Sequence, residues 1–262
     1  LLKETTAVGL TPNVISYNSA IDACSRGGQW KTALVLLKEM TTVGVIPNVI
    51  SYNSAIGALG EGPALLKEIT AVGLTPDIIS YTATIDACSR GGQWETALAL
   101  LKEMAAVGLT PDVVSYNAAI DACSKGGQWE STLSLLKEMT AVGLTPNVVS
   151  YTLAIGACST GGQWEDALAL LKEMAAVVLT PNVVSYTSAI DACSRGGQWE
   201  SALSLLKEMT AVGLTPNVIS YTSAIDACSR GVQWETALAL LKEMTAVGLT
   251  PDVISYTSAI DA

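Results

Sequence analysis

The chain has 262 residues, of which 50% are hydrophobic, with no histidine and a formal net charge of −10. This charge argues against a non-specific polyanion binder, because that affinity comes mostly from Lys and Arg neutralising phosphates. Charged residues recur too often for an apolar run of about 18 residues, so no membrane-spanning helix is expected.

The sequence is built from one repeated unit. Tryptophans mark it at Trp30, Trp94, Trp129, Trp164, Trp199 and Trp234, and from Trp94 onward they are 35 residues apart. Such a fixed period indicates stacked repeats, each touching mainly its neighbours, rather than one closed core. We therefore expect a single domain over residues 1–262. It comprises a partial unit at 1–13, repeats at 14–48, 49–77, 78–112, 113–147, 148–182, 183–217 and 218–252, and a partial unit at 253–262.

Both ends of the chain fall in mid-unit, and the first residue is Leu1 rather than Met. We interpret the chain as a fragment, so that a leader peptide or a further domain would lie outside it.

The first half of each unit predicts a short helix, as the unit at 113–147 illustrates. Pro111 interrupts the preceding segment, and Asp112 or Ser115 can cap the helix start. An apolar stripe with helical spacing follows at Tyr116, Ala119, Ile120 and Cys123. The glycine pair at 126–127 ends this helix in a turn.

The second half predicts an antiparallel partner helix. It begins near Trp129, where the acidic Glu130 suits the helix dipole, and Gly143 and Pro146 stop it. Its apolar stripe is Trp129, Thr132, Leu133, Leu136 and Met139. We expect the Trp, Tyr, Cys, Met and paired Leu residues to form the core, which one helix pair cannot bury alone. The Lys-Glu pairs, such as residues 137–138, are expected on a solvated outer face.

The unit at 49–77 departs from the pattern because it has only 29 residues. The segment 59–63 stands where other units have Cys, a basic residue, the glycine pair and Trp. The second helix must be short and start near Pro63, which is tolerated in the first turn. A missing large side chain at an interface can cost about 3–5 kcal/mol. A kink or soft spot is one interpretation, and an error in the gene prediction is the other.

The six cysteines occupy the same position in their repeats, which does not suggest disulfide pairing. They are Cys24, Cys88, Cys123, Cys158, Cys193 and Cys228. Stacked helices lie about 8–10 Å apart, whereas a disulfide needs Cα atoms within about 7 Å. We expect free, buried thiols that act as small apolar residues, which fits a reducing compartment.

The unit resembles the P-type repeat of the pentatricopeptide repeat (PPR) family. The resemblance rests on S-Y-N-x-A-I-D-A before the glycine turn, A-L-x-L-L-K-E-M after it and G-L-T-P-[ND] at the end. Tetratricopeptide repeats have 34 residues and a W-x2-L-G-x2-Y signature that is absent here. The departures are the short unit, the Trp at the second helix start, and Thr160 where neighbours have Arg or Lys.

The resemblance implies an all-α fold, a right-handed α-solenoid of stacked antiparallel helix pairs. It also implies sequence-specific binding of single-stranded RNA, one base per repeat. Proteins of this family act mostly in mitochondria and plastids on RNA processing, stability, editing or translation. No cofactor, metal, membrane or small-molecule substrate is implied.

The resemblance also assigns roles to positions in each unit. The main base-reading residue follows each tyrosine: Asn18, Asn53, Thr82, Asn117, Thr152, Thr187, Thr222 and Thr257. The second follows the proline that closes the unit: Asn48, Asp77, Asp112, Asn147, Asn182, Asn217 and Asp252. The residue two before each tyrosine sandwiches the base: Ile15, Ile50, Ile79, Val114, Val149, Val184 and Ile219. Phosphate-facing cations end the first helices: Arg26, Arg90, Lys125, Arg195 and Arg230.

The reading positions are chemically suitable on their own terms, because Asn, Thr and Asp are small hydrogen-bonding groups that can read a Watson–Crick edge. Variation alone is weak support, since exposed slots such as Thr96 and Ser131 vary as well. The family's preferences are Asn/Asp for U, Asn/Asn for C over U, Thr/Asp for G and Thr/Asn for A. Applied in order, the repeats predict 5′-C-U-G-C-A-A-G-3′.

Two alternatives stay open at this point. The cations can instead be ordinary helix C-terminal residues that favour the dipole, and the solenoid can be a scaffold for protein partners, a use that suits a basic partner. Catalysis is not expected, because the chain has no His and its carboxylates, such as Asp86 and Asp121, recur once per repeat. A catalytic domain outside the fragment is compatible with this interpretation.

Overall fold

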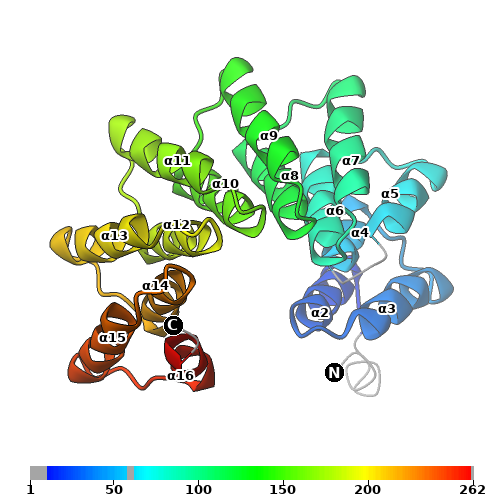
Figure 1. The fold of residues 1–262 in the computed structure, drawn as a ribbon. Coiled ribbons are helices and arrows are strands. Elements are labelled where there is room, and N and C mark those ends of the chain that lie inside the picture. Colours follow the sequence, from blue (N-terminus) through cyan, green and yellow to red (C-terminus); the bar gives the residue numbers. More distant parts are fainter. Residues whose placement is uncertain (1–10, 58–61, 261–262) are drawn as a thin grey trace. The chain divides into compact units, whose positions relative to one another are not determined.

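The computed structural model describes residues 11–57 and 62–260, and every regular element among them is a helix (Figure 1). The first helices of the repeats are α2 (Val14–Arg26), α4 (Val49–Ile56), α6 (Ile78–Arg90), α8 (Val113–Lys125), α10 (Val148–Thr160), α12 (Val183–Arg195), α14 (Val218–Arg230) and α16 (Val253–Ile260). The second helices are α3 (Trp30–Thr42), α5 (Gly62–Ala71), α7 (Trp94–Ala106), α9 (Trp129–Ala141), α11 (Trp164–Ala176), α13 (Trp199–Ala211) and α15 (Trp234–Ala246). Most of the partial unit at 1–13, part of the segment 59–63 and residues 261–262 lie outside the described residues.

The chain divides into two compact units, an N-terminal unit of residues 1–126 and a C-terminal unit of residues 127–262. Within the N-terminal unit, the first helices α2, α4, α6 and α8 pack in succession, and α2, α4 and α6 each pack against their own second helix. The C-terminal unit repeats this arrangement with α10, α12, α14 and α16. The all-α class and the stacking of helix pairs are thus confirmed within each unit, whereas a single domain over the whole chain stays a prediction.

The Asn or Asp that follows the unit-closing proline caps the start of the next first helix. Asp112 is the residue before α8, and its side chain accepts a hydrogen bond from the amide of Ser115 at 2.8 Å. Before α6, Asp77 and Ser80 form a reciprocal capping box, in which each side chain binds the other's backbone amide. The predicted cap is therefore Asp112, and Ser115 is its partner rather than a rival cap.

In the repeat at 113–147, the core side chains come from the predicted apolar stripes of both helices. Tyr116, Ile120, Cys123, Leu136 and Met139 are all buried, as the sequence predicts. Leu135 is buried as well, although it was not predicted as part of the second stripe. Leu133, which was predicted, is only half-buried.

The prediction that tryptophan belongs to the core is wrong, because the described indoles are half-buried or exposed, with Trp234 55% exposed. The reason lies in the next repeat. A Cβ added to Gly161 would lie 2.5 Å from Cδ1 of Trp129. The indole thus packs against the glycine that ends the first helix of the next repeat, and this contact leaves it only half-buried.

The Lys-Glu pairs are exposed as predicted, for example at Lys102 and Glu103. The glutamate also accepts a hydrogen bond from the tyrosine of the same repeat, as in Tyr81 to Glu103 at 3.0 Å. Burial, reinforced by the glutamate, raises the pKa of Tyr81 to about 12. This contact joins the first helix of a repeat to its second.

All six cysteines are free, and all except the half-buried Cys24 are buried. Burial raises the pKa of Cys88 and Cys123 to about 11. The prediction of unpaired thiols acting as apolar residues is confirmed.

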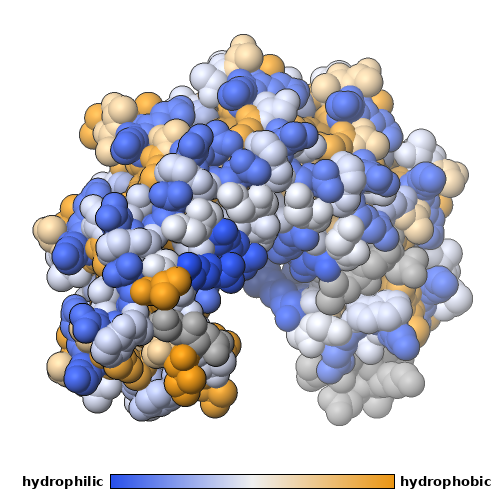
Figure 2. All heavy atoms as spheres, viewed as in Figure 1, coloured by the Kyte–Doolittle hydropathy of each residue, from blue (hydrophilic) through white to orange (hydrophobic). Residues whose placement is uncertain are grey.

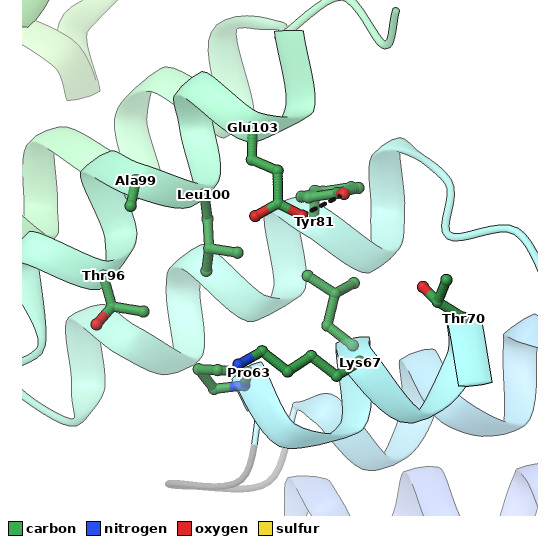
Figure 3. A pocket seen from close by; sticks show the side chains of 9 residues that line it. Pro63, Lys67, Thr70, Tyr81, Thr96, Ala99, Leu100 and Glu103 are labelled. Carbon is green, nitrogen blue, oxygen red and sulfur yellow. Dashed lines mark hydrogen bonds between the residues drawn. The ribbon is translucent and has the colours of Figure 1, made fainter. Parts of the chain in front are cut away.

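The second helix of the short repeat is shortened as predicted, and its first helix is shortened as well. Helix α4 has 8 residues and α5 has 10, against 13 in other repeats, and α5 begins at Gly62, one residue before Pro63. A shallow pocket lies between α5 and α7, where Pro63 and Lys67 face Leu100 and Glu103 (Figure 3). A soft spot here stays a prediction.

Among the described helices, none has both the length and the apolar character needed to cross a membrane.

Candidate functional site

The residues predicted to sandwich a base are exposed apolar side chains on the first turn of each first helix. Their exposed fractions range from 53% for Val149 to 73% for Ile15. The tyrosine two residues later is buried in every complete repeat, so the two side chains point to opposite sides. Each unit therefore presents a row of aliphatic groups to solvent, beside the polar reading residues.

In two repeats the main reading residue is an asparagine that donates a hydrogen bond to the second reading residue, which is Asn or Asp. In the N-terminal unit, Asn18 donates from Nδ2 to Oδ1 of Asn48 at 3.5 Å, and Asn53 donates to Asp77 at 3.2 Å. The structure thus brings together these predicted pairs, although they are 24 or 30 residues apart.

The threonine reading residues make a different contact. Except at Thr257, their hydroxyl groups lie at 2.7–2.8 Å from the hydroxyl of a serine on the next first helix. The pairs are Thr82 with Ser115, Thr152 with Ser185, Thr187 with Ser220, and Thr222 with Ser255. A threonine therefore reaches the second reading residue only through this serine.

The second reading residues also cap helices, which the sequence analysis recognised only for Asp112. Asn48, Asp77, Asp112, Asn147, Asn182 and Asn217 each precede a first helix and accept a hydrogen bond from its third residue. Burial raises the pKa of Asp77, but the amide and hydroxyl of Ser80 and the amide of Asn53 outweigh it, so the pKa is lowered. Hydrogen bonds from Ser255 lower the pKa of Asp252. Both carboxylates are ionised and only accept hydrogen bonds.

The serine between the two reading positions was not predicted as a site residue. It is fully buried at Ser51, Ser80, Ser115, Ser150, Ser185, Ser220 and Ser255. The spacing Asn/Asp-x-x-Ser, which resembles a capping box, was the available sequence signal. It identifies a helix start, but it does not reveal that a residue of the preceding repeat also reaches the serine.

The predicted phosphate-facing cations are each paired with an aspartate one turn earlier. Arg195 and Arg230 lie 2.9 Å from the carboxylates of Asp191 and Asp226, and Lys125 lies 2.6 Å from Asp121. Arg26 pairs with Asp22 at 2.9 Å and Arg90 pairs with Asp86. The cations remain on the first helices as predicted, but each ion pair is close to neutral.

One full-length repeat lacks both the aspartate and the cation of this ion pair. In the repeat at 148–182, Gly156 and Thr160 occupy the two places, and Thr160 bonds the carbonyl of Ala157. The i, i+4 spacing of Asp and Arg is a known helix pair, so this pairing was visible in the sequence and was missed.

The second helices carry a mixed outer surface. In the C-terminal unit, hydrophilic and hydrophobic residues alternate over α11, α13 and α15 (Figure 2). Exposed Lys and Glu residues and the exposed valines at the helix ends, such as Val177 and Val212, account for this pattern. Among the described residues, no three His, Cys, Asp or Glu side chains gather as a metal site would require.

Comparison with known proteins gives one repeat family along most of the chain. Sequence models of the PPR repeat family match residues 12–61, 76–125, 111–160, 146–195 and 181–230, and a PPR repeat model matches residues 219–249. No curated protein matches the chain.

The solved structures of similar fold include three with PPR repeats. The pentatricopeptide repeat protein PPR10 from maize has 23% identity and a TM-score of 0.63, over 98% of this chain and 42% of that chain. The same protein in complex with an 18-nt psaJ RNA element has 24% identity and a TM-score of 0.53, over 97% and 52%. The PPR domain of Arabidopsis thaliana protein-only RNase P 1, in complex with tRNA, has 19% identity and a TM-score of 0.58, over 66% and 91%. This chain therefore spans about half or less of the maize protein's structures.

Proposed function

Because the chain belongs to the pentatricopeptide repeat family, we propose that it binds single-stranded RNA in a sequence-specific way, with one base per repeat. The observation that carries the proposal is the exposed aliphatic residue beside a polar reading residue on each first helix. A base offers a flat apolar face and a hydrogen-bonding edge, and these two residue types match them. The maize relative was solved with an RNA element and the Arabidopsis relative with tRNA.

The reading residues support a defined target. The pairs Thr82/Asp112 and Thr222/Asp252 correspond to G, and the Thr/Asn pairs to A, by the family's preferences. The seven repeats then read 5′-C-U-G-C-A-A-G-3′, with U accepted at each C. Within each of the two compact units, successive first helices pack against each other and each carries an exposed aliphatic residue, which supports reading of consecutive nucleotides there.

Backbone affinity comes from the paired cations and is modest. An RNA phosphate must compete with an aspartate for each Arg or Lys, so the electrostatic contribution is smaller than five free cations would supply. Most discrimination therefore falls to the bases. We place the protein in organellar RNA metabolism, as the family resemblance implies, and assign it binding rather than catalysis.

The test is a competition between two oligonucleotides. Fluorescence anisotropy is measured with C-U-G-C-A-A-G and with C-U-A-C-G-G-A, in which the purines are exchanged, embedded in the same unstructured flanks. We expect binding of the first to be at least about tenfold tighter, since one correct base contact contributes about 1–3 kcal/mol in the comparable DNA case. Equal affinity for both would remove the base-reading proposal.

A protein-binding scaffold is the second candidate. The pairing of the cations with aspartates and the net charge of −10 favour a basic protein partner over a polyanion. The same measurement separates the two, because a scaffold has no reason to distinguish the two oligonucleotides.

A further inference from the structure

A buried serine hydrogen-bonds to both reading positions at Ser51, Ser115, Ser185, Ser220 and Ser255. Ser51 is fully buried, and its Oγ lies 2.7 Å from Oδ1 of Asn18 and 3.1 Å from Oδ1 of Asn48. A hydroxyl has a single proton, so it can fully satisfy only one of these acceptors. The direction in which the serine donates is therefore a choice between the reader and the cap.

The identity of the cap changes that choice in the asparagine-reading repeats. With the asparagine cap, Ser51 makes its shorter contact with the reader Asn18. With the aspartate cap, Ser80 donates to Asp77 at 2.9 Å, and Oδ1 of Asn53 is a buried acceptor with no hydrogen-bond partner. The carboxylate attracts the serine proton because hydrogen bonds to ionised acceptors are about twice as strong as neutral ones.

The distance between the serine hydroxyl and the cap is shorter at every aspartate cap than at any of the asparagine caps that begin a reading repeat. Serine to aspartate distances are 2.8–2.9 Å at Asp77, Asp112 and Asp252. Serine to asparagine distances are 3.0–3.2 Å at Asn48, Asn147, Asn182 and Asn217. The aspartate caps thus hold the serine proton more closely.

For a threonine reader, proton counting gives a definite polarity. If Ser115 donates to the carboxylate of Asp112, the 2.7 Å contact with Thr82 requires Thr82 to donate to Ser115. Thr82 then has only lone pairs left for a ligand. With a neutral asparagine cap, as at Asn182, the serine can donate to Thr152 instead, and the threonine proton is free to be donated.

Thr257 lies on α16, the last described helix, and it differs from the other threonine readers. Its hydroxyl donates to the carbonyl of Val253 at 2.8 Å and not to a serine. The serine therefore also holds the threonine hydroxyl away from its own helix and available to a ligand.

We propose that the buried serine is a specificity-determining positioning residue that transmits the identity of the cap, Asp or Asn, to the reader of the preceding helix. It does so by fixing whether a threonine reader accepts or donates toward the base. Guanine presents an N1–H donor and adenine an N1 acceptor on the Watson–Crick edge, so an accepting threonine selects G and a donating threonine is compatible with A. This inference rests on the proposed function. It explains how the change from Asp to Asn at the cap can change which purine the threonine reader selects.

The experiment is a double-mutant cycle in the full chain on Asp112→Asn and Ser115→Ala. Affinity is measured for C-U-G-C-A-A-G and for the same probe with A at the third nucleotide. With Ser115 present, Asp112→Asn should shift the G-to-A affinity ratio by about tenfold toward A, the effect of one hydrogen bond of about 1.4 kcal/mol. With Ser115→Ala present, the same substitution should shift the ratio less than about twofold, because the connection is missing.

Two controls separate positioning from general damage. Ser185→Ala is the matched change in a Thr/Asn repeat, and it should alter discrimination only at the fifth nucleotide. Ser115→Thr restores a hydroxyl and should recover the G preference. Far-ultraviolet circular dichroism of each variant verifies that the helices are retained.

An independent readout needs no RNA. Side-chain scalar couplings of Thr82, measured by NMR, should show its hydroxyl turning toward its own helix in Ser115→Ala, as Thr257 does. An unchanged Thr82 rotamer overturns the positioning role.

The outcomes distinguish the two proposals. If wild type prefers G and Asp112→Asn shifts the ratio equally with and without Ser115, the cap reads the base itself, and the serine proposal fails while RNA reading stands. If wild type does not distinguish the purine-exchanged probes, base reading fails and the serine proposal fails with it.

Discussion

At the residue scale, two valines occupy backbone positions that are glycine in the neighbouring repeats. Val178 has φ of 62° and Val232 has φ of 55°, in the left-handed region that β-branched residues avoid. The strain costs about 1–2 kcal/mol for an ordinary L-residue. Val178 is 89% exposed and Val232 74% exposed, so little burial offsets this cost.

Val178→Gly and Val232→Gly should each stabilise the protein. Relief of strain is partly offset by the greater freedom of glycine in the unfolded chain, which leaves a gain of roughly 0.5–1 kcal/mol. The free energy of unfolding in urea measures it. Val177→Gly is the control, because Val177 has an ordinary φ of −91° and should give no gain. Lower stability of Val178→Gly would contradict the strain argument.

A second residue-scale feature is the close approach of an indole to a glycine. Gly161→Ala places a Cβ against Trp129, whereas Gly91→Ala meets nothing closer than the carbonyl of Ala87 at 3.4 Å. The short repeat before Gly91 has no tryptophan, and Gly91 has φ of −88°, which alanine adopts freely. Gly161→Ala should therefore lower the free energy of unfolding by about 1–3 kcal/mol, as overpacking does.

Thermal melting of the two variants side by side checks this, with Gly91→Ala as the matched control. Equal melting temperatures would show that the tryptophan moves aside without cost.

At the element scale, the tyrosine-to-glutamate bond joins the two helices of a repeat. It is present from Tyr151 to Glu173 at 2.8 Å and from Tyr186 to Glu208 at 2.9 Å. Burial first, and then the glutamate, raises the pKa of Tyr151 and Tyr186 to about 12 from 10.0.

This contact predicts loss of stability in alkali. A raised tyrosine pKa means that the folded state favours the neutral phenol, so its contribution is complete below about pH 10 and is lost as pH rises toward 12. The buried thiols act in the same direction from about pH 9. Urea midpoints measured from neutral pH to about pH 11 should fall steeply at the alkaline end. Tyr186→Phe should be less stable at neutral pH but show a shallower alkaline fall, and an unchanged pH profile would contradict the assignment.

The helix pairs were predictable from sequence because their signals are local. Proline, glycine and the 3.6-residue apolar period fix where α8 and α9 begin and end, and Asp112 was recognised as a cap. The position of Trp129 was not predictable, because its surroundings are set by Gly161 in the next repeat. Hydrophobic character alone predicted a core position, whereas packing against Gly161 leaves Trp129 only half-buried.

The candidate site was predicted as a set of positions but not as a network. Repetition and family resemblance located Thr82 and Asp112. They did not show that Ser115 stands between the two, since this contact joins consecutive first helices and has no signature in either alone. The pairing of Arg195 with Asp191 was local and could have been inferred from the i, i+4 spacing.

At the scale of the whole molecule, the protein carries a net charge of −10, and its predicted phosphate contacts are cations already paired with aspartates. Single-stranded RNA releases about 0.7 counterion per phosphate neutralised. Five contacts would give a log–log salt slope of at most about 3.5 in magnitude, and competition by aspartate should reduce it further.

Titration of RNA binding against salt should therefore give a shallow slope. Arg195→Gln should lower affinity for all probes about equally and leave the purine discrimination intact, because a phosphate carries no sequence information. Lys207→Gln is the control, with the same charge change on the exposed face of α13. If Lys207→Gln weakens binding as much as Arg195→Gln, the RNA does not follow the first-helix cations.

The ladder of buried thiols gives this protein a reporter in nearly every repeat. A thiol-reactive reagent needs the thiolate, and burial keeps the pKa of Cys158 near 12 and that of Cys193 near 11. Each cysteine should be alkylated only when its own repeat opens, with the half-buried Cys24 first. Pulsed alkylation read by mass spectrometry would then rank the repeats by local opening rate. Opening of the short repeat would not be reported, because that repeat has Leu59 at the cysteine position.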